Sequence, residues 1–154
     1  MSFLLVVLFS ISLSPVYSQT ASFEELLIDV GYATFVTHVW ADESEDAEAI
    51  FALPGSGADV SRYEDLGPIL ADAGYQLIAI NQRGILGSNG NLEQITLRDL
   101  ANDVIAIADK MGIEKFHMAG WAFGNRTSRM VATTYPDRLA SLILVAAGGL
   151  VQPL

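Results

Sequence analysis

The sequence contains no cysteine and has few basic side chains, and each shortage excludes a class of chemistry. Without cysteine there is no disulfide, no thiolate nucleophile and no cysteine metal site. Only eight Lys and Arg residues stand against 18 Asp and Glu residues, which gives a formal net charge of -10. Nucleic acids and anionic membrane surfaces bind clustered Lys and Arg. The basic residues of this chain are scattered, and so we expect neither nucleic acid nor an anionic membrane as a partner of the mature protein.

Histidine is also scarce, since only His38 and His117 are present. Each lies alone in a predicted strand, without companions at the spacing of metal ligands. We interpret both as packed or hydrogen-bonded strand residues, not as catalytic bases, and the sequence implies no metal and no cofactor. The acidic run at residues 42–48 could bind a cation or a partner, but a solvated loop is the interpretation we adopt.

Long hydrophobic runs are missing as well. The apolar stretch Phe3–Leu13 is too short to cross a bilayer as a helix, and small residues follow it in Ser14–Ser18. This pattern predicts a signal peptide over residues 1–18, cleaved after Ser18, and a secreted or periplasmic protein. An uncleaved anchor or a misassigned start codon are the alternatives, because Met1 and Ser2 carry no basic side chain. In each case the segment is left out of the fold.

The remaining chain reads as one α/β domain. Of the 154 residues, 51% are hydrophobic and 17% are charged, which suits a globular domain with an apolar core. Hydrophobic periodicity alternates between extended and helical segments. Strands are expected over Leu26–Val30, Ala33–Trp40, Ala49–Leu53, Tyr75–Ile80, Lys115–Ala119 and Leu142–Ala147, and helices over Glu64–Ala73, Thr96–Met111 and Asn125–Tyr135.

This order predicts a mostly parallel central sheet with helices on both faces, a three-layer α/β fold. The runs Gln76–Ile80 and Leu142–Ala147 do not alternate polar with apolar residues, and so we expect them to be buried on both faces. Thr96 and Asp99 form a pattern resembling a capping box at the start of the second helix.

The segment Gly120-Trp121-Ala122-Phe123-Gly124 has the frame of the G-x-S-x-G nucleophile elbow. In that elbow a serine lies on a sharp turn between a strand and a helix, and flanking glycines let the two backbones approach. Here Ala122 occupies the position of the serine. Its methyl group can neither attack a carbonyl nor share a proton with a base. An ordinary tight turn is the alternative explanation when this motif is taken alone.

A set of motifs in chain order, covering about residues 24–149, resembles the α/β-hydrolase superfamily. These motifs are Leu53-Pro54-Gly55-Ser56-Gly57, the segment 73–84, Gly87-Ser88, Leu100-Ala101-Asn102-Asp103, the elbow, Tyr135-Pro136-Asp137-Arg138 and Leu142-Ile143-Leu144-Val145. More narrowly, Ala122–Arg126 followed by Ala146–Gly149 resembles a bacterial subgroup with alanine in the elbow. A native alanine and a serine-to-alanine variant leave the same letter at this position.

The resemblance implies roles for four further residues. The backbone N–H groups of Phe123 and Ser56 correspond to the oxyanion hole of the family. Trp121 and Gly57 are expected to line the substrate pocket. The loop before Ser56 departs from the family pattern, because Pro54-Gly55 replaces the usual His-Gly.

Other parts of the resemblance concern structure and the missing triad. Arg83, Ser88 and Asp103 match positions that we interpret as structural. The family places an acid and a histidine after its sixth strand, and residues 146–154 contain neither. We therefore expect residues 24–154 to be a partial α/β-hydrolase domain, truncated after the sixth strand, with that strand as an exposed apolar edge.

Three hypotheses of function follow. The parent protein is a hydrolase of small apolar, ester-like substrates that does not use residue 122 as its nucleophile. Alternatively, it is a non-catalytic protein that binds a small-molecule ligand near Phe123, Trp121 and Ser56. The third hypothesis is an inert fragment or a serine-to-alanine variant of an ordinary serine hydrolase. Fold alone does not separate them.

Overall fold

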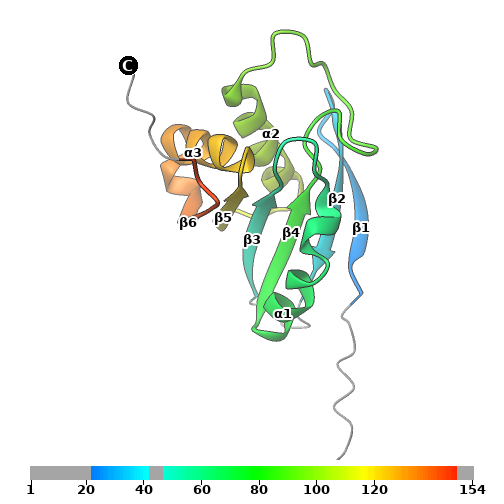
Figure 1. Cartoon of the computed structure of the whole chain (residues 1–154), viewed down its shortest axis with the longest axis vertical. Helices are drawn as coiled ribbons and strands as arrows, with labels where there is room; N and C mark the ends of the chain where they lie inside the picture. The colour runs from blue at the N-terminus through cyan, green and yellow to red at the C-terminus, as the bar shows by residue number, and fades with distance from the viewer. Residues whose placement is uncertain (1–21, 42–46, 149–154) are drawn as a thin grey trace, which may run out of the picture.

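The computed structural model of the chain describes residues 22–41 and 47–148 (Figure 1). The predicted signal peptide and most of the acidic run lie outside these residues. The described strands form one six-stranded sheet in the order β1-β2-β4-β3-β5-β6. The strands are β1 (Glu24–Asp29), β2 (Thr34–Trp40), β3 (Glu48–Leu53), β4 (Tyr75–Ile80), β5 (Phe116–Trp121) and β6 (Leu139–Val145). The helices are η1 (Val60–Tyr63), α1 (Leu66–Asp72), α2 (Leu97–Lys110), α3 (Gly124–Thr134) and η2 (Pro136–Arg138).

The sheet is parallel through β4, β3, β5 and β6, and β2 pairs antiparallel with both β1 and β4. Two apolar layers cover it, because successive strand residues point to opposite faces. Phe51 and Ile78 belong to the core that includes residues of α2 and α3. Ile50 and Leu77 belong to the core that includes Ala71 of α1. The prediction of a three-layer α/β fold with helices on both faces is confirmed.

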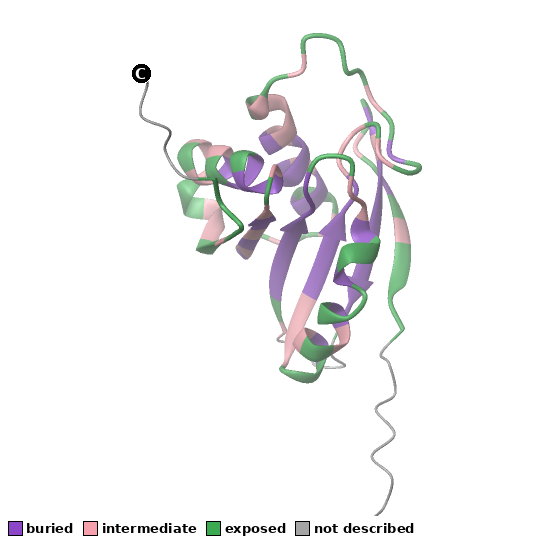
Figure 2. Ribbon diagram, in the orientation of Figure 1, coloured by how far each residue is buried: buried purple, intermediate pink, exposed green. Residues whose placement is uncertain are grey.

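The edge strand β6 differs from its prediction. Leu142–Ala147 was expected to be buried on both faces, yet Leu142, Ile143 and Val145 are 37%, 43% and 49% exposed. The central strands β3 and β4 are largely buried, in contrast to β6 (Figure 2). The reason is position: within the described residues β6 pairs only with β5, and α1 packs mainly against β2 and β4. The expectation of an exposed apolar edge is confirmed.

Helix α2 begins with the predicted capping box. The Thr96 N–H donates to Asp99 Oδ2 at 2.8 Å, and the Asp99 N–H donates to Thr96 Oγ1 at 3.2 Å. The hydrogen bonds from the Thr96 hydroxyl and N–H lower the pKa of the Asp99 carboxyl. Because the folded-state pKa is lowered, this contribution to stability is present at neutral pH and is lost as acid protonates the carboxylate.

The turn after β4 is fixed by residues that the sequence predicts to be structural. Arg83 donates to both Asp103 carboxylate oxygens, at 2.7 and 2.6 Å, and so ties this turn to α2. The Ser88 hydroxyl donates to the Asn81 carbonyl at 2.8 Å and accepts from the Val36 N–H at 2.9 Å. These contacts confirm the structural interpretation of Arg83, Ser88 and Asp103. None of the helices among the described residues is long and apolar enough to cross a membrane.

Gly67 provides a test of the packing between α1 and β2. A methyl group at this position would overlap the ring of Trp40, which is 1% exposed. Helix propensity alone predicts that Gly67→Ala gains about 1 kcal/mol. We expect instead a loss of about 1–3 kcal/mol, because the buried ring has no room to move. Urea denaturation measures the change, and Gly148→Ala, where the new methyl meets no atom within 4 Å, is the control. A more stable Gly67→Ala protein would contradict this packing.

Candidate functional site

We call the sharp turn that joins β5 to α3 the elbow, after the motif that its sequence resembles. Ala122 follows the last residue of β5 and has a φ of +50°, a left-handed conformation that residues other than glycine rarely adopt. Its N–H donates to the Val145 carbonyl at 3.1 Å, which ties the turn to the end of β6. The Ala122 side chain is exposed at the carboxyl end of the parallel strands.

The two flanking glycines are required by close backbone contacts. A Cβ at Gly120 would lie 2.5 Å from Ser128 Oγ and 2.6 Å from the Gly124 carbonyl oxygen. A Cβ at Gly124 would overlap the Leu53 carbonyl at the end of β3. β5 and α3 therefore approach so closely that only glycine fits at these two positions, as the motif predicted.

The loop after β3 lies against this elbow. A Cβ at Gly55 would come within 3.3 Å of the Ala122 Cβ, so the two turns are in near contact. Ser56, Gly57 and Phe123 line a shared cavity of about 200 Å³. Within residues 22–41 and 47–148, the N–H groups of Ser56 and Phe123 donate to no protein acceptor. The structure thus brings these two predicted residues together with free backbone donors.

A second cavity, of about 520 Å³, borders the elbow. We call it the basic cavity; it is lined by Ala122, Phe123, Asn125, Arg126, Arg129, Ala146 and Gly148. The Asn125 amide Nδ2 donates to the Val145 carbonyl at 2.8 Å, the same oxygen that accepts from Ala122. Asn125 is 3% exposed, and its Oδ1 has no hydrogen-bond partner in the described part of the chain.

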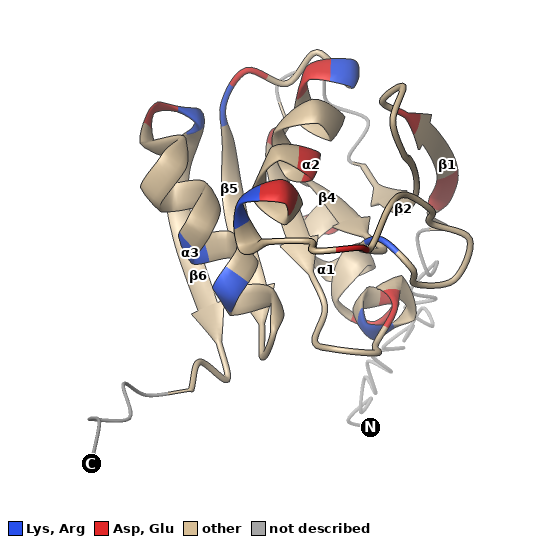
Figure 3. Cartoon of the chain, turned by 90° about the horizontal axis from the view of Figure 1, so that it is seen from above, with Lys and Arg blue, Asp and Glu red and all other residues tan. Residues whose placement is uncertain are grey.

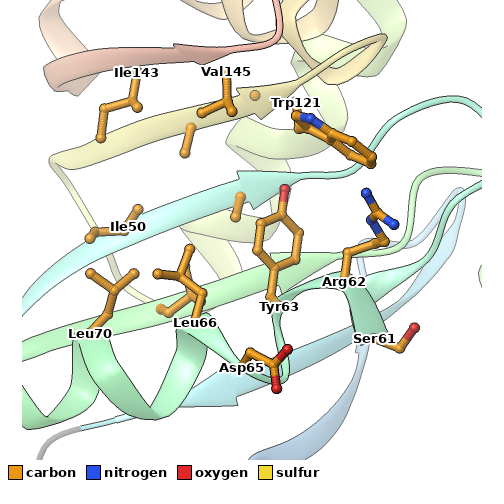
Figure 4. Close-up of a pocket in the computed structure, with 14 residues that line it drawn as sticks. Ile50, Ser61, Arg62, Tyr63, Asp65, Leu66, Leu70, Trp121, Ile143 and Val145 are labelled. Atoms are coloured by element: carbon orange, nitrogen blue, oxygen red, sulfur yellow. The ribbon is translucent and has the colours of Figure 1, made fainter.

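Trp121 lines a third space, an apolar cleft of about 640 Å³ on the α1 face of the sheet (Figure 4). Arg62 stacks on the indole, with its guanidinium carbon 3.8 Å from the ring centroid. Tyr63 points its hydroxyl into the cleft, and burial raises the pKa of that phenol, which keeps it protonated. Trp121 and Gly57, expected to share a pocket, thus line different cavities. The cause is strand geometry: Trp121 is still part of β5 and points to one face, while Gly57 lies beyond the end of β3.

Both histidines lie away from Ala122. His117, near the start of β5, contacts Ser141 Oγ at 2.8 Å and Glu48 Oε2 at 3.3 Å. His38 stacks on Phe23 at 3.8 Å between ring centroids and contacts Glu25 at 3.1 Å. Their interpretation as packed or hydrogen-bonded strand residues is confirmed. No group of three His, Asp or Glu side chains in the described ranges could hold a metal ion.

Several residues at these sites were not predicted from the sequence. Arg126 and Arg129 are three apart on α3, and this spacing alone places them on one helix face. Their proximity to Ala146 and Gly148 depends on how β6 ends, which the sequence pattern did not show. The stacking of Arg62 on Trp121 joins residues far apart in the sequence and had no local signal.

Residues 49–153 match the family model of the alpha/beta hydrolase fold. The chain therefore belongs to the alpha/beta hydrolase family. It is 35% identical over 115 residues to 2-hydroxy-6-oxo-6-phenylhexa-2,4-dienoate hydrolase of Comamonas testosteroni, covering 71% of this chain and 40% of that protein. It is 27% identical over 128 residues to fluoroacetate dehalogenase of a Burkholderia species, covering 80% and 40%.

Solved structures agree on the fold. A bacterial membrane phospholipase A superposes with a TM-score of 0.77 at 22% identity, over 86% of this chain and 42% of that one. Epoxide hydrolase A from Mycobacterium thermoresistibile gives 0.74 at 23% identity, over 80% and 39%. At this level of identity the likeness concerns fold only. The chain spans about two fifths of the length of each of these four proteins.

Two substitutions that should change the free energy of unfolding in opposite directions test the elbow. Ala122→Gly should raise the free energy of unfolding by about 1 kcal/mol, because glycine adopts a positive φ without steric cost. Gly124→Ala should lower it by about 3 kcal/mol, because the new methyl meets the Leu53 carbonyl. Urea denaturation at pH 7 measures both. Wild-type stability of the Gly124→Ala protein would refute the close approach of α3 to β3.

Proposed function

We propose that this chain forms a carbonyl-binding site of the alpha/beta hydrolase type, which holds small apolar, ester-like compounds without a nucleophile at residue 122. One observation supports the proposal: Ala122, at the residue where the motif would place a nucleophile, has a strained left-handed backbone, although its side chain cannot react. Such strain costs on the order of 1–3 kcal/mol and persists where the surrounding structure holds it, often at a functional site. Glycine at this position would remove the strain.

The binding chemistry follows from the backbone donors beside Ala122. A ligand carbonyl in the cavity between the two turns would accept hydrogen bonds from the N–H groups of Ser56 and Phe123, which have no protein acceptor within the described residues. These donors belong to the backbone, and so they do not depend on the side chain at residue 122. Gly55 also lines this cavity, and it separates the cavity from the exposed Ala122.

A second candidate function is hydrolysis by the whole protein. It is supported by the curated relatives, two of which are named as a hydrolase and a dehalogenase and are more than twice as long as the matched region. In that case groups outside the described residues would supply the nucleophile or activate water. Among the described residues no histidine contacts the elbow, and so none acts as a general base there.

Ala122→Ser separates these functions. We expect neither the native chain nor the Ala122→Ser variant to hydrolyse 4-nitrophenyl butyrate faster than buffer, because a serine without a base is a weak nucleophile. Release of 4-nitrophenolate is the measurement, with Ala122→Gly as the control at the same position. Hydrolysis by the native chain would contradict the binding function. Hydrolysis by the serine variant alone would show that a base reaches residue 122.

Ser56 tests the backbone donor directly. Ethyl butyrate should bind the native chain and move the amide resonances of Ser56 and Phe123 in ¹H–¹⁵N spectra. Ser56→Pro removes the N–H and should weaken binding about tenfold, the usual effect of losing one such hydrogen bond. Ser56→Ala keeps the N–H and is the matched control, with affinity near the native value. Equal losses in both variants would mean that the hydroxyl, not the backbone, contacts the ligand.

A further inference from the structure

The loop that follows β4 contains the one Asn-Gly pair of the sequence, Asn89-Gly90. We propose that Asn89 is a site of spontaneous deamidation in the folded protein, where its side-chain amide is converted to the carboxylate of an aspartate or isoaspartate. The proposal is independent of the carbonyl-binding function. Three properties of the pair support it: the exposure of Asn89, the available N–H of Gly90, and the backbone conformation that keeps glycine there.

The reaction needs only water and hydroxide. The Gly90 N–H loses its proton to hydroxide, and the nitrogen attacks the side-chain carbonyl carbon of Asn89. A new N–C bond closes a cyclic imide, the bond from that carbon to Nδ2 breaks, and the amide nitrogen takes a proton from water and leaves as ammonia. Water then opens the imide, at the side-chain carbonyl to give aspartate or at the backbone carbonyl to give isoaspartate. The net change is one water consumed and one ammonia released.

Both reacting groups are available in the folded chain. Asn89 is exposed, so that water and hydroxide reach it. Among residues 22–41 and 47–148, the Gly90 N–H donates to no protein acceptor. The Thr34 N–H donates to Asn89 Oδ1 at 2.8 Å. A hydrogen bond to this oxygen stabilises the negative charge that develops on it during the attack, and so it favours ring closure.

The fold keeps glycine after Asn89. Gly90 has a φ of +126°, which residues with a side chain rarely adopt. A Cβ at this position would lie 3.0 Å from the Ala33 Cβ and 3.0 Å from Arg83 Cδ. Asn89 also serves the fold, because its N–H donates to the Thr34 carbonyl at 2.9 Å while its side chain accepts from the Thr34 N–H. The same contacts that hold this loop on β2 therefore retain the reactive pair.

Asn91 is a matched comparison within the same loop. It is exposed, and its Oδ1 accepts from the Glu93 N–H at 2.8 Å, as Asn89 Oδ1 accepts from a backbone N–H. The difference is the next residue, because Leu92 carries a branched side chain beside the nitrogen that would attack. We expect Asn91 to react at least about tenfold more slowly than Asn89, since glycine adds no such obstruction.

The test is incubation of the full, folded chain at pH 9, followed by tryptic digestion and tandem mass spectrometry. One tryptic peptide, residues 84–98, carries both Asn89 and Asn91, and its fragment ions assign a gain of about 1 Da to one of them. Asn89 should convert, and more slowly at pH 7, where hydroxide is scarcer. Asn89→Gln keeps an amide but would have to close a larger ring, and so this variant should gain no mass at residue 89.

The product also carries a different charge. Acidic side chains already lie on α2 and β1 (Figure 3), and deamidation adds one more negative charge to a chain of net charge -10. The converted protein should therefore elute later than the native chain from an anion exchanger, and the separated fraction should contain both aspartate and isoaspartate at residue 89.

Several results would overturn the proposal. Conversion of Asn89 in chain unfolded by guanidinium chloride, with none in the folded chain over the same time, would mean that the fold protects the pair. Equal conversion of Asn89 and Asn91 would refute the role of Gly90. Aspartate as the sole product would exclude the cyclic imide, because direct hydrolysis of the amide leaves the backbone unchanged. A mass gain in Asn89→Gln equal to that of the native chain would place the reaction at another residue.

Discussion

The close approach of two backbones, where α3 begins against the end of β3, is the constraint on which the site depends. Gly124 lies against the Leu53 carbonyl, and Gly120 lies against Ser128, so any side chain at either glycine would force the strand and the helix apart. That approach sets the left-handed turn at Ala122. It also places the loop after β3 beside the elbow, since Gly55 nearly touches Ala122. Both cavities that Phe123 lines border this contact.

Much of the fold was predictable because local signals agreed with the tertiary structure. Tyr75–Ile80 is the strand that the pattern predicted, and Thr96 and Asp99 form the expected capping box. The burial of β6 was not predictable in the same way. A run of apolar residues indicates a buried strand, but burial also requires a neighbour on each side, and β6 has only β5 among the described strands.

The candidate site, like the fold, was only partly predictable from the sequence. The glycines of the elbow are visible in the sequence, because their spacing follows from backbone sterics. Which cavity a side chain enters depends on strand pleat and on partners far along the chain, and this separated Trp121 from Gly57. The basic cavity required both the helix spacing of its arginines and the path of the chain after β6. Only the first of these was in the sequence pattern.

The Val145 carbonyl accepts hydrogen bonds from both the Ala122 N–H and the Asn125 amide, at 3.1 and 2.8 Å. The elbow and the first turn of α3 are therefore both held to β6 by the same carbonyl oxygen. Fraying of the end of β6 would release the Ala122 N–H to solvent, and anything that stiffens this end would protect it. The hydrogen-exchange rate of the Ala122 amide thus reports how often the end of β6 opens.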